Sequence, residues 1–339
     1  MGLQISEIIG KKEIQFRDLK GKTLAVDAFN AIYQFLTTIR QPDGTPLKDS
    51  SGNITSHLSG LFYRNINLLN EGIKLVYVFD GKAPELKKKT HENRKKVKDE
   101  MKDKYEKAVR DEDVDAMGKY SRGFVTLDEQ KINESIELLE AMGIAVIRAP
   151  GEGEAQASYF ANKGRVYAVA SQDYDCLMFK APLLIQNLSM SRKRRTVTGF
   201  KEIYPQVIEL ELVLKELEIN QEQLIVLGIL CGTDYNPGGV KGLGPKKSLK
   251  VVKEHKTKEK IFEAVELNEK YEVDFDWKEI YDEIEKPNID SDVEIEFPKI
   301  DKNKIKDILV KYEFSSDRIE KSLEKLDKII SDKAQRTLF

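Results

Sequence analysis

Two pairs of carboxylates in the middle of the chain have the spacing of a metal site. Glu152 and Glu154 form the first pair and Asp173 and Asp175 the second, with an amphipathic segment and a short apolar run between them. Carboxylates two residues apart beside buried strands repel one another strongly in a low dielectric unless a positive charge lies between them. A hard divalent cation with oxygen ligands is the simplest way to neutralise them.

Three further acids follow apolar segments elsewhere in the chain. Asp27 and Asp80 come directly after the β-type runs 23–26 and 74–79, and Asp234 follows a longer apolar segment and a short turn. Each of these acids, taken alone, could equally be a turn residue or a helix cap. The seven together favour a shared metal site, and oxygen ligation with few histidines favours Mg²⁺, with Mn²⁺ as the alternative ion.

The elements that must position these acids follow an α/β pattern. Compact apolar runs at 144–147 and 166–170 are typical of buried strands, and a helix is predicted over 155–163. Because ligands bind at the carboxyl ends of parallel strands, we expect the acids to share one edge of a parallel sheet.

The α/β pattern is interrupted between Pro84 and Ser121. This stretch has few apolar residues and many good helix formers, which predicts one or two exposed helices inserted as a lid or gateway after the strand that precedes Asp80. Lys87 and Arg94 are two helical turns apart and would face the same way on such a helix. Two cations directed at a metal-held phosphate would stabilise the charge of a transition state.

Charge is unevenly distributed along the chain, although the net charge is only −2. Segment 87–110 carries a local charge of +6, and Arg192–Arg195 form a second basic cluster, whereas segment 263–301 carries −11. This distribution indicates a polyanionic partner for the basic segments. The alternative, a solvated helix face, stays open for 87–110, and the acidic segment has no recognisable motif.

A glycine-rich loop lies between two apolar-periodic segments in the range 224–255. The second segment is predicted to begin as a helix at Pro245, and free backbone amides at a helix start bind phosphate without reading bases. The pattern therefore predicts a helix, loop, helix hairpin for a duplex backbone. Its glycines and lysines are Gly238, Gly239, Gly242, Gly244, Lys246 and Lys247.

Composition excludes several other classes of protein. Cys176 and Cys231 lie far apart in apolar stretches, as expected of free thiols in a reducing compartment. His57, His91 and His255 have no zinc-ligand spacing, and no apolar run is long enough to cross a membrane. We expect an intracellular protein, in the cytoplasm or nucleoid, or in the nucleus if the source is eukaryotic.

Five stretches together resemble flap endonucleases of the archaeal and eukaryotic kind. They are VDAFNAIYQF from Val26, VYVFDGKAPELK around Tyr77, GEGEA, SQDYDCL, and LCGTDYNPGGVKGLGPKK from Leu230. The resemblance implies an α/β fold, a mostly parallel sheet with helices on both faces, an arch and a duplex-binding hairpin. The implied regions are an N-terminal nuclease region 1–98, the rest of the arch 99–115, an internal nuclease region 116–258, a C-terminal helical region 259–330 and a tail 331–339.

The resemblance also implies roles for individual residues. The seven acids match metal-site positions for two Mg²⁺ ions, Lys87 and Arg94 match arch residues that meet the scissile phosphate, and the glycine loop resembles a site for K⁺. Tyr33 matches an aromatic residue that stacks on a base, although it could also be a core residue. DNA-contacting positions by this resemblance are Tyr33, Arg40, Arg64, Glu152, Gly232, Asp234, Gly242, Gly244, Lys246 and Lys247.

The activity implied is hydrolysis of a phosphodiester at the base of a 5′ flap by two metal ions, in Okazaki-fragment processing and DNA repair. A 5′–3′ exonuclease or RNA-cleaving relative and a non-catalytic junction-binding scaffold are the alternatives. Gln335, Leu338 and Phe339 resemble the start of a tail that binds the sliding clamp (PCNA). We expect a monomer whose partners are branched DNA and this clamp, with no membrane contact.

Overall fold

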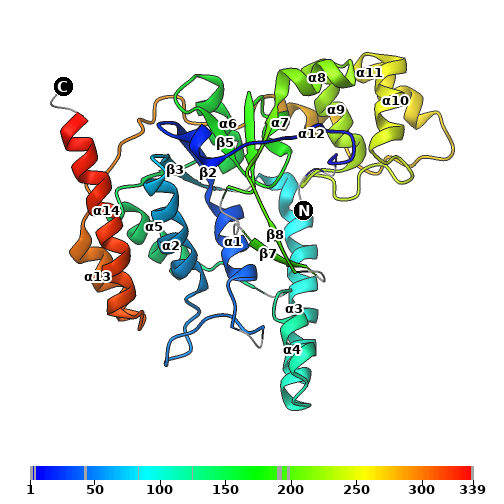
Figure 1. Ribbon diagram of the computed structural model, residues 1–339. Helices are drawn as coiled ribbons and strands as arrows, with labels where there is room; N and C mark the ends of the chain where they lie inside the picture. The colour runs from blue at the N-terminus through cyan, green and yellow to red at the C-terminus, as the bar shows by residue number, and fades with distance from the viewer. Residues whose placement is uncertain are drawn as a thin grey trace.

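A mostly parallel sheet is the centre of the computed structural model, which describes residues 3, 5–41, 44–82, 84–123, 125–188, 193–196 and 199–336. In this part of the chain its seven strands run in the order β1-β9-β6-β5-β2-β3-β4 (Figure 1). The central strands β6, β5, β2, β3 and β4 are parallel, and β9 is antiparallel to both β6 and β1. The bounds are β1 (Lys12–Glu13), β2 (Thr23–Asp27), β3 (Lys74–Phe79), β4 (Ala145–Arg148), β5 (Ala168–Ala170), β6 (Leu183–Gln186) and β9 (Gln206–Glu209). A separate hairpin pairs β7 (Lys193–Thr196) with β8 (Gly199–Glu202).

The four predicted strands are present, with shifted bounds for three of them. β3 matches the predicted run, and β2 extends one residue further to include Asp27. β4 and β5 begin later than predicted because the first residue of each apolar run closes the preceding helix instead. The Ile144 amide donates to Leu139 O (3.0 Å), and the Val166 amide donates to Phe160 O (3.4 Å).

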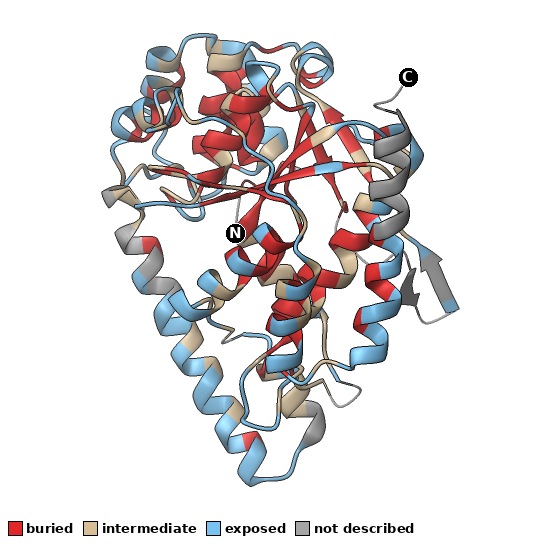
Figure 2. Cartoon of the chain, turned by 90° about the vertical axis from the view of Figure 1, so that its left-hand side faces the viewer, coloured by how far each residue is buried: buried red, intermediate tan, exposed pale blue. Residues whose placement is uncertain are grey.

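Alternate side chains of the central strands belong to two hydrophobic cores, one on each face of the sheet. Ala25, Val76 and Val78 pack in one core, and Leu24 and Tyr77 pack in the other, as the two-residue period of a strand requires. The first core lies under α6 (Gly153–Asn162), α7 (Asp175–Met178), α8 (Leu210–Leu217), α9 (Gln221–Cys231), α10 (Pro245–His255), α11 (Lys258–Glu266) and α12 (Trp277–Glu285). The second lies under α1 (Ala28–Thr38), α2 (Ser56–Asn70), α5 (Glu129–Ala141), α13 (Lys302–Lys311) and α14 (Ser316–Arg336). Figure 2 shows the buried residues of both cores on either side of the strands.

The predicted insertion between 84 and 121 forms two helices that project away from the sheet. A short 3₁₀ turn, Glu85–Lys87, leads into α3 (Lys88–Arg110), after which the chain turns back so that α4 (Val114–Tyr120) packs against the end of α3 (Figure 2). Arg40, after α1, anchors the end of α4 because its guanidinium donates to Ser121 Oγ (2.6 Å) and to Ser121 O (3.3 Å). The insertion is therefore attached to the core at both ends.

The acidic C-terminal segment is part of the packing of both cores. Helices α11 and α12 lie in the first core and α13 and α14 in the second. The linking segment 286–300 (orange in Figure 1) is held to α6 by Gln156, whose amide donates to Asp290 O (2.8 Å) and accepts from the Asp290 amide (2.7 Å). Arg165 donates to Ser291 O (3.4 Å), close to the same turn.

A small polar cluster joins the C-terminal helices to the N-terminal region. Glu134 on α5 accepts from Tyr312 Oη (2.6 Å) and lies 3.0 Å from His57 Nε2 on α2. Burial alone would raise the pKa of Glu134, but the hydrogen bonds from His57, Tyr312 and Gln130 outweigh it and lower that pKa. No helix in the described residues is both long and apolar enough to cross a bilayer.

Candidate metal centre and nucleic-acid interface

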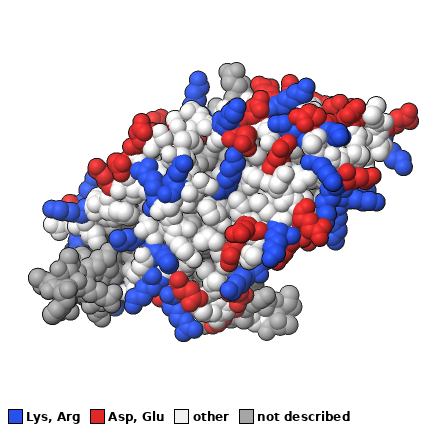
Figure 3. All heavy atoms as spheres, turned by 90° about the horizontal axis from the view of Figure 1, so that it is seen from above, with Lys and Arg blue, Asp and Glu red and all other residues white. Residues whose placement is uncertain are grey.

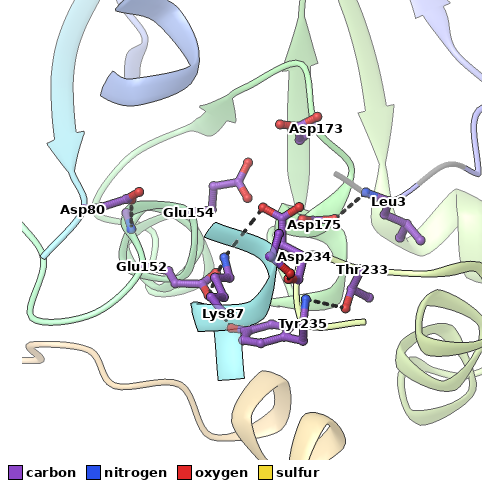
Figure 4. Close-up of polar contacts among 12 residues, drawn as sticks. Leu3, Asp80, Lys87, Glu152, Glu154, Asp173, Asp175, Thr233, Asp234 and Tyr235 are labelled. Carbon is purple, nitrogen blue, oxygen red and sulfur yellow. Dashed lines mark hydrogen bonds and ion pairs between the residues drawn. The ribbon is translucent and has the colours of Figure 1, made fainter. Parts of the chain in front are cut away.

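A cavity of about 820 Å³ lies at the carboxyl edge of the sheet. Its lining includes every acid that the sequence singled out, contributed by the ends of β2 and β3, the loop after β4, the turn after β5 and the turn after α9. These acids are Asp27, Asp80, Glu152, Glu154, Asp173, Asp175 and Asp234. Figure 4 labels Asp80, Glu152, Glu154, Asp173, Asp175 and Asp234 and shows the elements from which they come. The structure thus brings together acids that lie as far apart in sequence as residues 27 and 234.

Backbone amides hold three of the carboxylates in place. Asp27 caps α1, with Oδ1 accepting from the Asn30 amide (3.0 Å), and Asp80 Oδ1 accepts from the Gly153 amide (2.6 Å). A Cβ at position 153 would lie 2.7 Å from Asp80 Oδ1, so the glycine between the two glutamates allows Asp80 to approach. Asp175 Oδ1 accepts from the amide of Leu3 (2.8 Å), which brings the N-terminal segment to the site.

Two polar side chains that the sequence did not reveal orient further carboxylates. Asn30 Nδ2 donates to Asp173 Oδ2 (3.0 Å), and Ser171 Oγ donates to Glu154 Oε1 (2.9 Å). Asn30 lies one helical turn after Asp27, and Ser171 lies two residues before Asp173. Only their closeness in sequence to predicted site residues could have pointed to Asn30 and Ser171, and many other polar residues are equally close to such residues.

Crowding of these acids makes their negative charge unfavourable. Burial, with the charge of Asp80 added, raises the pKa of Asp27 to about 7, and burial with the charge of Asp173 raises the pKa of Asp175 to about 7. Burial and the charge of Asp27 raise the pKa of Glu154 as well. This oxygen-rich set matches the ligand preference of a hard divalent cation, which would stabilise the ionised carboxylates.

Lys87 supplies the positive charge among the carboxylates of the described structure. Its Nζ lies 2.7 Å from Glu152 Oε1 and 3.9 Å from Asp234 Oδ2 (Figure 4). Burial alone would lower the pKa of Lys87, but the neighbouring acids, Glu152 first among them, raise it. Among the described residues no group of three or more metal-ligating side chains is already arranged to hold one ion.

The predicted base-stacking residue Tyr33 faces the cavity and is only half-buried. Lys98, on α3, places its Nζ 5.3 Å from the centroid of the Tyr33 ring, across the opening between α1 and the insertion. This position is compatible with stacking and does not support the alternative of a core residue. Arg94 also lies in α3, but its side chain is outside the described part of the chain.

Arg40 and Arg64, which the resemblance implies as DNA contacts, are not freely exposed in the structure: Arg40 is hydrogen-bonded within the protein and Arg64 is partly buried. The Arg40 guanidinium donates to Thr37 O, Leu36 O and Gly44 O as well as to Ser121, so these bonds would have to be exchanged before it contacted a phosphate. Burial lowers the pKa of Arg64, which lies partly buried on α2. Both DNA contacts stay predictions.

The glycine loop is closely packed where α9 ends and open where α10 begins. A Cβ at Gly232, which has φ +100°, would lie 2.6 Å from the Gly239 amide, so the two glycines allow the loop to fold back on the helix end. Lys246 and Lys247 are exposed in the first turn of α10. The predicted hairpin is therefore present, with its helix start accessible to a phosphate backbone.

The predicted basic cluster 192–195 and the predicted clamp-binding tail lie only partly within the described residues. Arg192 lies outside the described residues, and residues 193–195 lie in β7 without described side chains. Gln335 lies in α14, whereas Leu338 and Phe339 fall outside the described residues. On the face seen in Figure 3, basic and acidic side chains intermingle.

The sequence of this chain matches one family of known proteins. Residues 2–101 match the XPG N-terminal domain and residues 143–234 match the XPG I-region. The chain is 48% identical over 334 residues to Flap endonuclease 1 of Hyperthermus butylicus, covering 97% of this chain and 95% of the relative. It is 47% identical to Flap endonuclease 1 of Pyrococcus furiosus, covering 100% and 98%.

The fold of this chain is similar to the solved structures of related nucleases. Flap endonuclease-1 from Methanococcus jannaschii superposes with a TM-score of 0.77 at 39% identity, covering 98% of this chain and 100% of that one. The catalytic core of Rad2 in complex with DNA substrate superposes with a TM-score of 0.71 at 25% identity, covering 97% and 100%.

Proposed function

This chain belongs to the flap endonuclease family, and we propose that the seven acids of its cavity bind two Mg²⁺ ions, with Mn²⁺ as an alternative. The protein is a structure-specific nuclease, a metal-dependent phosphodiesterase that acts on DNA in replication and repair. The observation that carries the proposal is the convergence of seven carboxylates on one cavity, where Lys87 lies between Glu152 and Asp234. When bound, divalent ions supply Lewis-acid chemistry that activates water and stabilises a leaving oxygen.

We assign phosphate binding, carboxylate orientation and base stacking to individual side chains. Lys87, which pairs with Glu152 in this structure, would bind the scissile phosphate and stabilise its developing charge. Asn30 and Ser171 keep Asp173 and Glu154 oriented. Tyr33 stacks on a base beside the cavity.

Binding of the duplex is assigned to the glycine hairpin. The exposed start of α10, with Lys246 and Lys247, contacts the phosphate backbone, and the loop around Gly239 and Gly242 would hold a K⁺ ion that supplies further positive charge for the backbone. The two helices α3 and α4 form the arch under which the 5′ strand passes. Substrate choice then follows from the shape of the junction and not from base sequence.

End-labelled double-flap DNA in Mg²⁺ provides the test of this assignment. We expect one incision near the junction, preferred over plain duplex, a gapped duplex and the same flap made of RNA, and no incision with a chelator. The reason is that strand passage under the arch requires a free 5′ single strand beside a bent duplex. Stepwise shortening of all duplex ends would identify an exonuclease instead, and cleavage that survives chelation would contradict the metal assignment.

We also propose that Gln335, Leu338 and Phe339 bind the sliding clamp, and that the nuclease acts as a monomer inside the cell. Removal of residues 335–339 is expected to lower clamp affinity about tenfold or more, because an aromatic anchor of this kind contributes at least about 1.4 kcal/mol. A binding titration of the full and shortened chains against the clamp measures this. Equal affinities would remove the clamp assignment, while cleavage of free flap DNA is expected to be the same for both chains.

A further inference from the structure

Tyr235 lies in a turn after α9 that several hydrogen bonds hold in place. It directly follows the predicted metal ligand Asp234. Thr233 donates to Asn236 Oδ1 from both its amide (3.1 Å) and its hydroxyl (2.8 Å), and Asn236 Nδ2 donates back to Ile229 O (2.7 Å). The Tyr235 amide donates to Thr233 Oγ1 (3.1 Å). Thr233 and Asn236 are buried, so the backbone of Tyr235 is held firmly in place.

The Tyr235 side chain connects this turn with two other parts of the site. Its hydroxyl donates to Glu152 Oε1, at the start of α6, and its ring centroid lies 5.0 Å from Lys87 Nζ, at the base of the arch. The same oxygen, Glu152 Oε1, is 2.7 Å from Lys87 Nζ. One carboxylate oxygen is thus shared by the ammonium and the phenol (Figure 4).

This sharing affects how readily the ion pair opens. Lys87 must leave Glu152 before it can contact a phosphate, and Glu152 must turn to a metal ion. A hydrogen bond from Tyr235 removes part of the charge that holds Lys87 on Glu152 Oε1, and the aromatic face offers the ammonium a second attractive neighbour. The fixed phenol also restricts the rotation of the Glu152 carboxylate.

We propose that Tyr235 is a positioning residue that orients Glu152 for metal binding and Lys87 for phosphate binding. The proposal rests on the assignment of Glu152 as a metal ligand given above. Residues that hydrogen-bond to a ligating carboxylate typically contribute a factor of about 10 to 100 in metal affinity or activity. The same range is expected here.

The variant Tyr235→Phe keeps the ring and loses the hydroxyl. We expect its single-turnover cleavage of flap DNA to be about 10- to 100-fold slower, and Mn²⁺ binding to the DNA-free protein, followed by calorimetry, to be weaker. The flap DNA concentration at half-saturation and the melting temperature should stay those of the parent, because the packed ring is retained. A role in packing alone would leave both the rate and the Mn²⁺ affinity unchanged.

Two comparisons make the test specific. Tyr312→Phe removes the tyrosine to glutamate hydrogen bond with Glu134, remote from the cavity, and is expected to lower the melting temperature without slowing cleavage. In a Glu152→Gln background, Tyr235→Phe should cause no further loss of Mn²⁺ affinity, because its effect passes through Glu152.

Two outcomes would overturn the role of Tyr235: unchanged rate and Mn²⁺ affinity in Tyr235→Phe, or an equal loss of affinity with and without Glu152. The metal assignment is judged separately by Mn²⁺ binding to the parent and its loss in Asp173→Ala. Failure of that binding is therefore distinguishable from failure of the positioning role.

Discussion

Replacement of Asp173 by alanine is expected to abolish cleavage while leaving the affinity for branched DNA largely intact. Asp173 is only partly buried, and its carboxylate lines the cavity, where Asn30 orients it. Because Asp173 is one of the proposed metal ligands, its loss is expected to remove several kcal/mol of transition-state stabilisation, so the single-turnover rate should fall by about 10³-fold or more. DNA affinity should change little, because we assign duplex binding to the exposed lysines at the start of α10 and not to Asp173.

Single-turnover cleavage and DNA binding in chelator measure the two effects separately. The control is Asp307→Ala, which removes an exposed carboxylate from α13 and should cleave like the parent. Retained turnover in Asp173→Ala would count against the metal assignment. Equal loss of DNA affinity and of rate would instead indicate that Asp173 supports the structure of the binding surface.

Replacement of Lys87 by methionine should have the next largest effect. The methionine fills similar space but has no charge for the scissile phosphate, so the rate at saturating DNA should fall by about 10²- to 10³-fold. Without Lys87, Glu152 and Asp234 also lose their cation. Added Mg²⁺ should therefore raise the melting temperature of this variant more than that of the parent, because the ion binds without competition from the ammonium.

Thermal melting with and without Mg²⁺, together with the single-turnover rate, checks both parts. Lys102→Met makes the same change of charge on α3 at an exposed position, where Lys102 lies 4.0 Å from Glu106, and is expected to keep the parental rate. A similar loss in both variants would show that the general positive charge of the arch, and not the position of Lys87, supports cleavage.

Local pattern was enough to predict the sheet edge and its acids. Short apolar runs are strands because β-branched and aliphatic residues suit a buried, pleated surface, and parallel strands deliver the residues after them to one edge. The few residues around each acid were therefore enough to predict the convergence of Asp27, Asp80, Glu152 and Asp173. The insertion and the glycine hairpin were predicted on the same local grounds, through helix formers and turn glycines.

Contacts between distant segments were decided by the tertiary structure alone. Leu3 bonds to Asp175 across 172 positions, Tyr235 to Glu152 across 83, and Arg40 to Ser121 across 81. The linking segment 286–300 offered no motif, yet it is held to α6 through Gln156. The sequence determined which chemistry the site can perform, because residue type and strand-end position are local properties. The orientation of each carboxylate and of Lys87 depends on partners brought near only by packing, for which no local pattern exists.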